Sequence, residues 1–80
     1  MDKKQIIKAI KPIFKNIFDN EDLQINEKSN SNNVDGWDSL NHILLVVEIE
    51  KKLNIRFSSN EISSFDNVGE MCEAISKKLN

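Results

Sequence analysis

The sequence predicts an all-α protein: a small antiparallel four-helix bundle with three main helices, one short helix and a long first loop. Apolar residues recur at spacings of three and four near both ends of the chain, and a long apolar run without Gly or Pro fills its middle. Both patterns are typical of helices rather than strands. Because 80 residues are enough for one small core, we expect residues 1–80 to form a single domain.

The first helix is expected from about Lys3 to Phe18, with Asp2 capping its start. Its apolar face repeats at three and four: Ile6, Ile7, Ile10, Ile13, Phe14, Ile17 and Phe18. Pro12 lies inside this pattern, where it removes the backbone hydrogen bond to the Lys8 carbonyl. Since the apolar phase continues across Pro12, we favour one kinked helix over two short helices with Pro12 in the first turn of the second.

A long polar connection follows, from residue 19 to residue 37, and residues 29–33 are expected to be its least structured part. Connections of this length are unusual in compact domains and are commonly functional or mobile. Four apolar residues are expected to anchor it over the helices: Leu23, Ile25, Val34 and Trp37. Trp37 could also contact a bound group, but we favour packing.

The central helix is expected from Ser39 to about Leu53, and a helical wheel gives it two apolar stripes. One stripe is fit for the core: His42, Leu45, Val46, Ile49 and Leu53. The second stripe contains Leu40, Ile43, Leu44 and Val47. Two explanations remain open for it: burial by neighbouring helices and the long loop, or exposure as a docking surface beside Ser39.

The remaining elements are predicted from capping residues and from the same periodicity. Asn54 is expected to end the central helix, and Ser58 or Ser59 to cap a short helical turn through Ile62. Asp66 or Asn67 then caps a last helix. Its apolar residues recur at three and four: Val68, Met71, Cys72, Ile75 and Leu79.

The charge balance and the cysteine count restrict the function. A net charge of −2 argues against general nucleic-acid binding, although the first segment is locally basic: Lys3, Lys4, Lys8, Lys11 and Lys15. Acidic residues gather between Asp19 and Asp38, either to keep a loop solvated or to favour a basic partner surface. Cys72 is the single cysteine, so it forms neither an internal disulfide nor a thiolate metal cluster. We expect a cytoplasmic monomer that binds no metal or nucleic acid and has no membrane span.

Ser39 is the candidate functional residue. It lies in the first turn of the central helix, where backbone N–H groups without intrahelical partners and the helix dipole favour an anionic group such as a phosphodiester. The surrounding sequence Gly36-Trp37-Asp38-Ser39-Leu40-Asn41-His42-Ile43 resembles the attachment site of acyl carrier proteins and peptidyl carrier proteins. The resemblance extends over nearly the whole chain, from about Lys3 to Leu79.

This resemblance implies a carrier without catalytic activity of its own. Phosphopantetheine would be transferred from coenzyme A to Ser39 by a phosphopantetheinyl transferase, and its thiol would hold an acyl or aminoacyl group as a thioester. A loading ligase and downstream acyl-using enzymes are the other implied partners. Asp38 and Leu40 would be recognised beside the serine, and Ile43, Leu44 and Val47 would extend the partner surface.

The chain departs from carriers of fatty acid synthesis in the charge of its central helix. In those proteins this helix is strongly acidic, whereas here Lys51 and Lys52 offset Glu48 and Glu50, and Leu44 occupies a place where an acid is frequent. The sequence looks more like stand-alone carriers attached to specialised biosynthetic pathways.

Two other classes of function compete with the carrier. His42 lies one turn after Ser39, as a base would in a minimal serine enzyme, but the chain has no Gly-x-Ser-x-Gly elbow and little volume for a substrate pocket. We therefore place His42 near a pocket edge rather than in catalysis. The other alternative is a non-carrier helical interaction module that uses the second apolar stripe.

Overall fold

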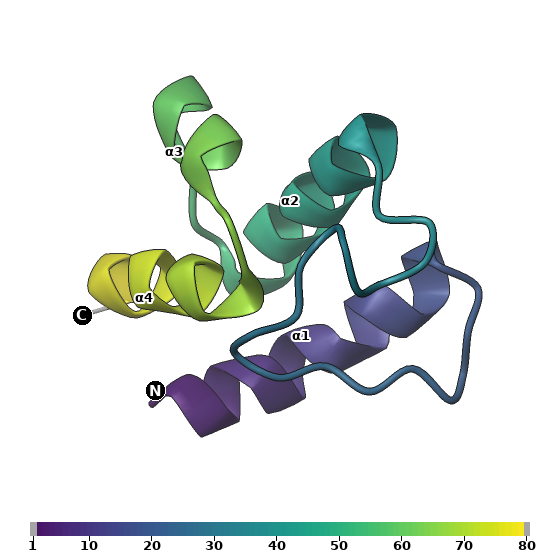
Figure 1. The fold of residues 1–80 in the computed structure, drawn as a ribbon. Helices are drawn as coiled ribbons and strands as arrows, with labels where there is room; N and C mark the ends of the chain where they lie inside the picture. Colours follow the sequence, from purple (N-terminus) through teal and green to yellow (C-terminus); the bar gives the residue numbers. More distant parts are fainter. Residues whose placement is uncertain (1, 80) are drawn as a thin grey trace.

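The computed structural model describes residues 2–79, which form four helices and no strands. The helices are α1 (Lys3–Ile17), α2 (Ser39–Leu53), α3 (Ser59–Ser64) and α4 (Val68–Leu79), and a long loop joins α1 to α2 (Figure 1). The all-α class, the three longer helices, the short helix and the long first loop were all predicted from the sequence. They are confirmed.

Helix α1 is one continuous helix that includes Pro12, so the two-helix alternative is wrong. Its start is closed by a capping box: the Asp2 carboxylate accepts from the Gln5 N–H at 2.9 Å, and the Gln5 amide oxygen accepts from the Asp2 N–H at 2.9 Å. These reciprocal bonds satisfy two backbone donors that the first turn otherwise leaves free. The helix ends at Ile17, one residue earlier than expected, and Phe18 is its C-cap.

The other helix ends follow the predicted capping residues closely. Asn54 ends α2 in the left-handed conformation, with φ of 55°, which asparagine tolerates better than most residues. Ser58 caps α3, which runs to Ser64 and so is longer than the turn we expected. Of the two candidates before α4, Asn67 is the cap, since its side-chain oxygen accepts from the Glu70 N–H at 2.9 Å.

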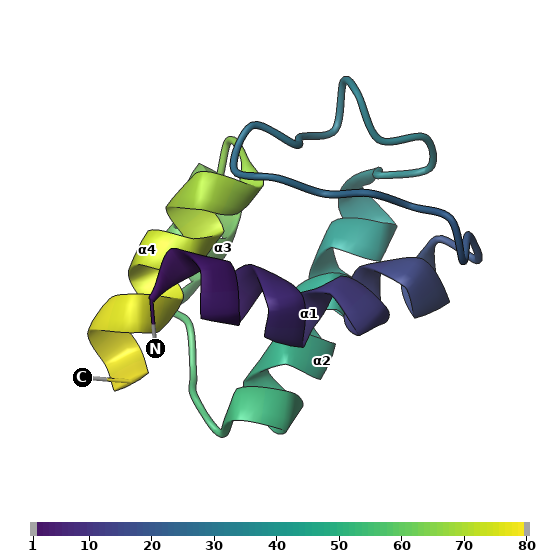
Figure 2. The ribbon, with the colours of Figure 1, turned by 90° about the horizontal axis from the view of Figure 1, so that it is seen from below.

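The core lies between α1 and the two helices it crosses, α2 and α4 (Figure 2). Its residues come from all three long helices and from the loop: Ile6, Ile10, Phe14, Ile25, Val34, Trp37, Leu45, Ile49, Val68, Met71, Cys72 and Ile75. Burial of such apolar surface is the main favourable contribution to folding. The loop therefore belongs to the core as well as to the surface.

Residues 29–33 were expected to be the least structured part of the loop, and this expectation was wrong. Ser29 is only 5% exposed, and its hydroxyl accepts from the Asn26 N–H at 2.9 Å. The Asn33 side chain accepts from the Asn30 N–H at 2.9 Å, and the Val34 N–H donates to the Asn30 carbonyl at 3.0 Å. Polar side chains thus build turns here instead of leaving the backbone to water.

The loop is also joined to the start of α4 through backbone hydrogen bonds. The Val68 N–H donates to the Ser29 carbonyl at 2.9 Å, and the Gly69 N–H donates to the Glu27 carbonyl at 2.8 Å. Two donors that the first turn of α4 leaves unpaired are satisfied in this way. This contact brings together segments about 40 residues apart, which sequence periodicity does not register.

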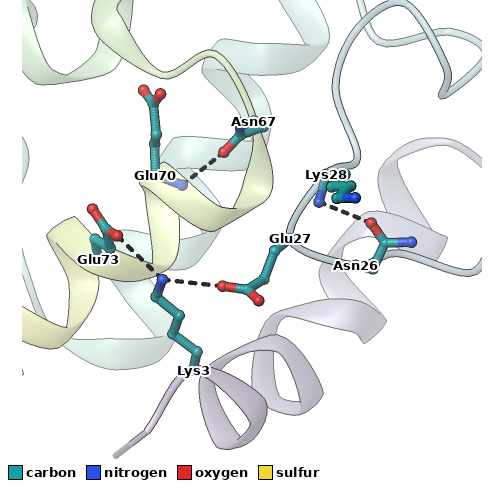
Figure 3. A network of polar contacts seen from close by, with 7 residues as sticks. All are labelled: Lys3, Asn26, Glu27, Lys28, Asn67, Glu70 and Glu73. Atoms are coloured by element: carbon teal, nitrogen blue, oxygen red, sulfur yellow. Dashed lines mark hydrogen bonds and ion pairs between the residues drawn. The ribbon is translucent and has the colours of Figure 1, made fainter.

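An ion-pair network reinforces this junction (Figure 3). The Lys3 ammonium contacts the Glu27 carboxylate at 3.0 Å and the Glu73 carboxylate at 3.1 Å, so it links the start of α1, the loop and α4. The hydrogen bond to Glu27, followed by that to Glu73, raises the pKa of Lys3 above its ordinary value. The groups are partly exposed, and the network contributes more to alignment than to stability.

The junction predicts the effect of enlarging Gly69. A Cβ at this position would lie 3.1 Å from the Glu27 carbonyl oxygen, which cannot withdraw without stretching its own bond to the Gly69 N–H. Gly69→Ala should therefore lower the free energy of unfolding by about 1–3 kcal/mol, although alanine is favoured by about 1 kcal/mol at ordinary helical positions. Urea unfolding measures this change. The exposed Lys77→Ala in the same helix is the control and should stay within about 0.5 kcal/mol of wild type; a more stable Gly69→Ala would contradict the close contact.

Candidate functional site

Ser39 is the first residue of α2, and Asp38 before it fixes the start of this helix. The Asp38 carboxylate accepts from the Asn41 N–H at 2.8 Å, and the Asp38 carbonyl accepts from the His42 N–H at 2.9 Å. A carboxylate at the N-cap is favoured both by this hydrogen bond and by the helix dipole. Asp38 therefore holds Ser39 at a defined place in the first turn.

The turn before Asp38 depends on Gly36, whose φ is 87°. Residues with a Cβ rarely adopt this conformation, whereas glycine does so at little cost. The Gly36 carbonyl accepts two hydrogen bonds, from the Asn41 side-chain amide at 2.7 Å and from the Asp38 N–H at 3.0 Å. Asn41 thus ties the turn to the helix, a role that sequence inspection missed because it needs the turn geometry.

The Ser39 side chain is exposed, and its hydroxyl makes no hydrogen bond with any residue among 2–79. Within the same described part of the chain, the N–H groups of Ser39 and Leu40 have no acceptor either. A free hydroxyl and two free N–H groups at the positive end of a 15-residue helix fit a phosphate ester on the Ser39 oxygen.

His42 does not face Ser39 as a catalytic base would. Because the Trp37 indole Nε1–H is a donor only, it donates to His42 Nδ1 at 3.1 Å. The hydrogen of the imidazole is therefore on Nε2, which donates to the Ile62 carbonyl at 2.8 Å. With both ring nitrogens engaged, His42 joins the loop, α2 and α3, and its place at the pocket edge agrees with our expectation.

An open groove of about 490 Å³ lies beside Ser39. It is bordered by the long loop, by the start of α2, by α3 and by the segment after α3: Ser31, Trp37, Asp38, Ser39, His42, Ile43, Ile62, Ser63, Phe65 and Asp66. Its walls are partly aromatic and partly polar. No sequence pattern indicated that Ser31, Ser63 and Asp66 line the groove, since only the fold brings these segments together.

Trp37 both packs in the core and lines this groove. Only 8% of the residue is exposed, and its ring meets the edge of Phe14 at 5.4 Å between centroids. Packing, which we favoured, is the main role of its ring. Trp37 lines the groove together with Ser39.

The second apolar stripe of α2 is exposed. The fraction of each residue open to solvent falls along the helix, from Leu40 at 67% through Ile43 at 53% and Leu44 at 46% to Val47 at 37%. Neither the loop nor another helix covers this side, so burial on both sides is wrong. The stripe begins directly after Ser39, and Asp38 is exposed beside it.

No group of three or more His, Cys, Asp or Glu side chains among residues 2–79 could hold a metal ion. Within the same residues, no helix is both long and apolar enough to cross a membrane.

Comparisons with known proteins agree with this geometry. A family model described as the phosphopantetheine attachment site matches residues 8–75. Among solved structures, the holo acyl carrier protein of Geobacter metallireducens, determined in solution by NMR, is similar at 34% sequence identity with a TM-score of 0.85. The similarity covers 92% of this chain and 85% of that protein. A comparison with curated protein sequences gave no match.

The family model and the solved structure both cover most of the chain, and both concern proteins that carry a covalent phosphopantetheine. The family consists of carriers without catalytic activity of their own, so the serine enzyme and the non-carrier module are set aside. The resemblance drawn from Gly36–Ile43 is confirmed. This chain belongs to the phosphopantetheine attachment family and is an acyl carrier protein-like carrier.

Proposed function

We propose that Ser39 is the residue to which phosphopantetheine is attached, and that this arm holds an acyl or aminoacyl group as a thioester. The observation that carries the proposal is the free, exposed Ser39 hydroxyl at the start of α2, beside two unpaired N–H groups and an open groove. Ser39 also lies inside the matched range of residues 8–75.

Five of the seven other serines differ from Ser39 in ways that support this choice. Four of them have hydroxyls engaged in hydrogen bonds to the backbone: Ser29, Ser58, Ser63 and Ser64. Ser59 is exposed at the start of a helix, but that helix has only six residues and therefore a weaker dipole than α2.

The residues around Ser39 would position the arm without reacting themselves. The N–H groups of Ser39 and Leu40 would hold the phosphodiester, and the Asp38 cap keeps them oriented toward it. When bound, the arm supplies a thiol that forms the thioester. The groove beside Ser39 gives the arm or its cargo a partly apolar surface to rest on.

We further propose that partners recognise Asp38, Leu40, Ile43, Leu44 and Val47. Carrier proteins work with a phosphopantetheinyl transferase and with acyl-handling enzymes. Each of these partners must reach Ser39, and the exposed apolar stripe is the surface they meet next. Exposed apolar patches of this kind commonly mark interaction sites.

The same stripe supports a role in a specialised biosynthetic pathway with a dedicated loading ligase. Leu44 presents an apolar side chain at the centre of the surface, and the Lys51 ammonium lies 3.8 Å from the Glu48 carboxylate and offsets its charge. A partner for this helix must therefore bury apolar side chains and not recognise an acidic helix surface.

We propose that the carrier works as a cytoplasmic monomer and that residues 1–80 form one domain. The single core shared by all three long helices supports the domain assignment.

The attachment site is tested by mass spectrometry. After incubation with coenzyme A and a broad-specificity phosphopantetheinyl transferase, the intact protein should gain one phosphopantetheine, and peptide mapping should find it on Ser39. Ser39→Ala should take up none while keeping a cooperative melt close to wild type, because the Ser39 hydroxyl makes no structural hydrogen bond. The exposed Ser59→Ala is the control and should be modified normally; an adduct on any other serine would refute the assignment.

Leu44 and its neighbour Leu45 form a matched pair for the partner surface. Leu44 is 46% exposed and Leu45 is fully buried. Leu44→Glu should change the free energy of unfolding by no more than about 0.5 kcal/mol, yet strongly slow phosphopantetheine transfer by adding charge to an apolar surface. Leu45→Glu should destabilise by several kcal/mol. Thermal melts and initial transfer rates separate the two effects, and a Leu44→Glu protein with a normal rate would remove Leu44 from the partner surface.

Thiol reactivity gives a further check on the holo protein. Burial, with a smaller contribution from the charge of Glu27, raises the pKa of the Cys72 thiol to about 11. At pH 8 only about one thousandth of Cys72 is then thiolate, and its side chain is also inaccessible. Titration with a thiol reagent at pH 8 should count one fast thiol in the holo protein, that of the arm, and none in the apo protein. In urea, the holo and apo proteins should each show one further reactive thiol, that of Cys72. A fast thiol in the folded apo protein would show that Cys72 is accessible.

A further inference from the structure

A row of four lysines runs along the outer side of α1: Lys4, Lys8, Lys11 and Lys15, named here the lysine row. Their spacing of i, i+4, i+7 and i+11 places them within an arc of about 60°, and the row is about 16 Å long. Lys4 and Lys8 are exposed, and Lys11 and Lys15 are half-buried. In Figure 2, α1 lies in front of α2, with its outer side open along most of its length.

The charge of this row is not neutralised within the molecule. Among residues 2–79, no carboxylate lies within 4.0 Å of any of the four ammonium groups. Lys11 donates to the Gln24 side-chain oxygen at 2.8 Å, but this partner is uncharged. Lys3, one residue before the row, is by contrast paired with both Glu27 and Glu73 (Figure 3).

Only Lys15 of the row, in the last turn of α1, is placed where the helix dipole favours a positive charge; the row as a whole does not serve the stability of the helix. Lysines three and four residues apart repel one another on a helix surface, and α1 has no acidic residue to relieve them. Lys4 also lies in the first turn, where the helix dipole disfavours a positive charge. An arrangement that opposes helix formation at several positions is better explained by an anionic group outside the chain.

We propose that the lysine row docks a row of carboxylates on a protein partner, such as one face of an acidic helix. The acidic residues that follow α1 restrict the choice: Asp19, Glu21 and Asp22 are exposed directly after its end. A lipid surface or a nucleic acid presents negative charge well beyond 16 Å and would be repelled by these residues. A row of carboxylates on a protein can be as short as the lysine row, so it does not have to approach Asp19, Glu21 and Asp22.

One further observation favours a protein over a membrane. The large apolar residues that are exposed in the described structure are Leu40, Ile43, Leu44, Val47 and Leu79, and none is on α1. The lysine row therefore brings no apolar group to insert between lipids, and stable membrane binding needs a second attraction besides charge.

The lysine row and Ser39 lie on different helices, so one partner can bind α1 while the start of α2 stays free. This inference does not depend on the identity of the attachment residue. A carrier held in this way would be kept near one enzyme while the groove and the apolar stripe remain open to others. Opposite charges at such an interface would accelerate association and set its orientation more than its strength.

Fluorescence anisotropy with a labelled acidic peptide tests the proposal. The probe is a helical peptide of about four turns with Glu at i, i+4, i+7 and i+11, and a scrambled peptide of the same composition is its reference. At low salt the matched peptide should bind wild type more tightly than the scrambled one. Lys4→Glu/Lys8→Glu/Lys15→Glu should weaken binding about tenfold or more, and salt should weaken it for wild type.

A second set of variants controls for net charge and folding. Lys28→Glu/Lys51→Glu/Lys77→Glu makes the same change in net charge at exposed positions off α1 and should bind almost as wild type does. Replacing the lysine row by Gln should also abolish the preference while circular dichroism shows an unchanged helix content, and Ser39→Ala should bind normally.

The proposal is overturned by any of four results. The first is equal binding of the matched and scrambled peptides. The second is an equal loss of binding in Lys28→Glu/Lys51→Glu/Lys77→Glu. The third is row-dependent binding to vesicles with anionic lipid, or to single-stranded DNA, that is tighter than binding to the matched peptide. The fourth is row-dependent dimers in sedimentation, which would make a second copy of this chain the occupant.

Discussion

The hydrogen bond from Trp37 Nε1 to His42 Nδ1 holds together the parts on which the site depends. The Trp37 ring packs on Phe14 of α1, and His42 contacts α3 by donating a hydrogen bond to the Ile62 carbonyl. The loop, α1, α2 and α3 therefore meet within a few residues of Ser39. This polar bridge has both of its donors satisfied, as a partly buried network must if it is not to be costly. This network also engages both ring nitrogens of His42, the residue that would otherwise suggest catalysis.

The long loop is ordered because its polar groups bond to one another and to α4. Side chains of asparagine and serine close its turns, and the Ser29 and Glu27 carbonyls accept from the first turn of α4. Ile25, Val34 and Trp37 then fix it to the core. These contacts define the path of the chain up to Asp38. They place Ser39 closely while its hydroxyl remains free of hydrogen bonds to the described residues.

The surface divides into two regions of different chemistry. Helix α2 presents an apolar stripe that starts at Ser39, and α1 presents positive charge that the molecule does not neutralise. Apolar surface gains most from burial, whereas exposed charge mainly steers and orients encounters. A carrier that meets several enzymes benefits from two separate surfaces. The apolar stripe lies at Ser39, and the lysine row can bind a partner without using the stripe.

The sequence by itself determined the four helices, the approximate positions of their ends and the position of Ser39 in the first turn of α2, because periodicity and capping act between residues a few positions apart. It also carried the family resemblance in the residues around Ser39. The wheel also placed Leu45 in the stripe fit for the core, and Leu45 is buried. Only the tertiary structure decided that Leu44 is exposed, since a helical wheel shows which residues share a face but not what covers it. The order of residues 29–33 and the groove beside Ser39 were likewise decided by contacts with α4 and α3. These contacts join segments far apart in the chain, and no local pattern records them.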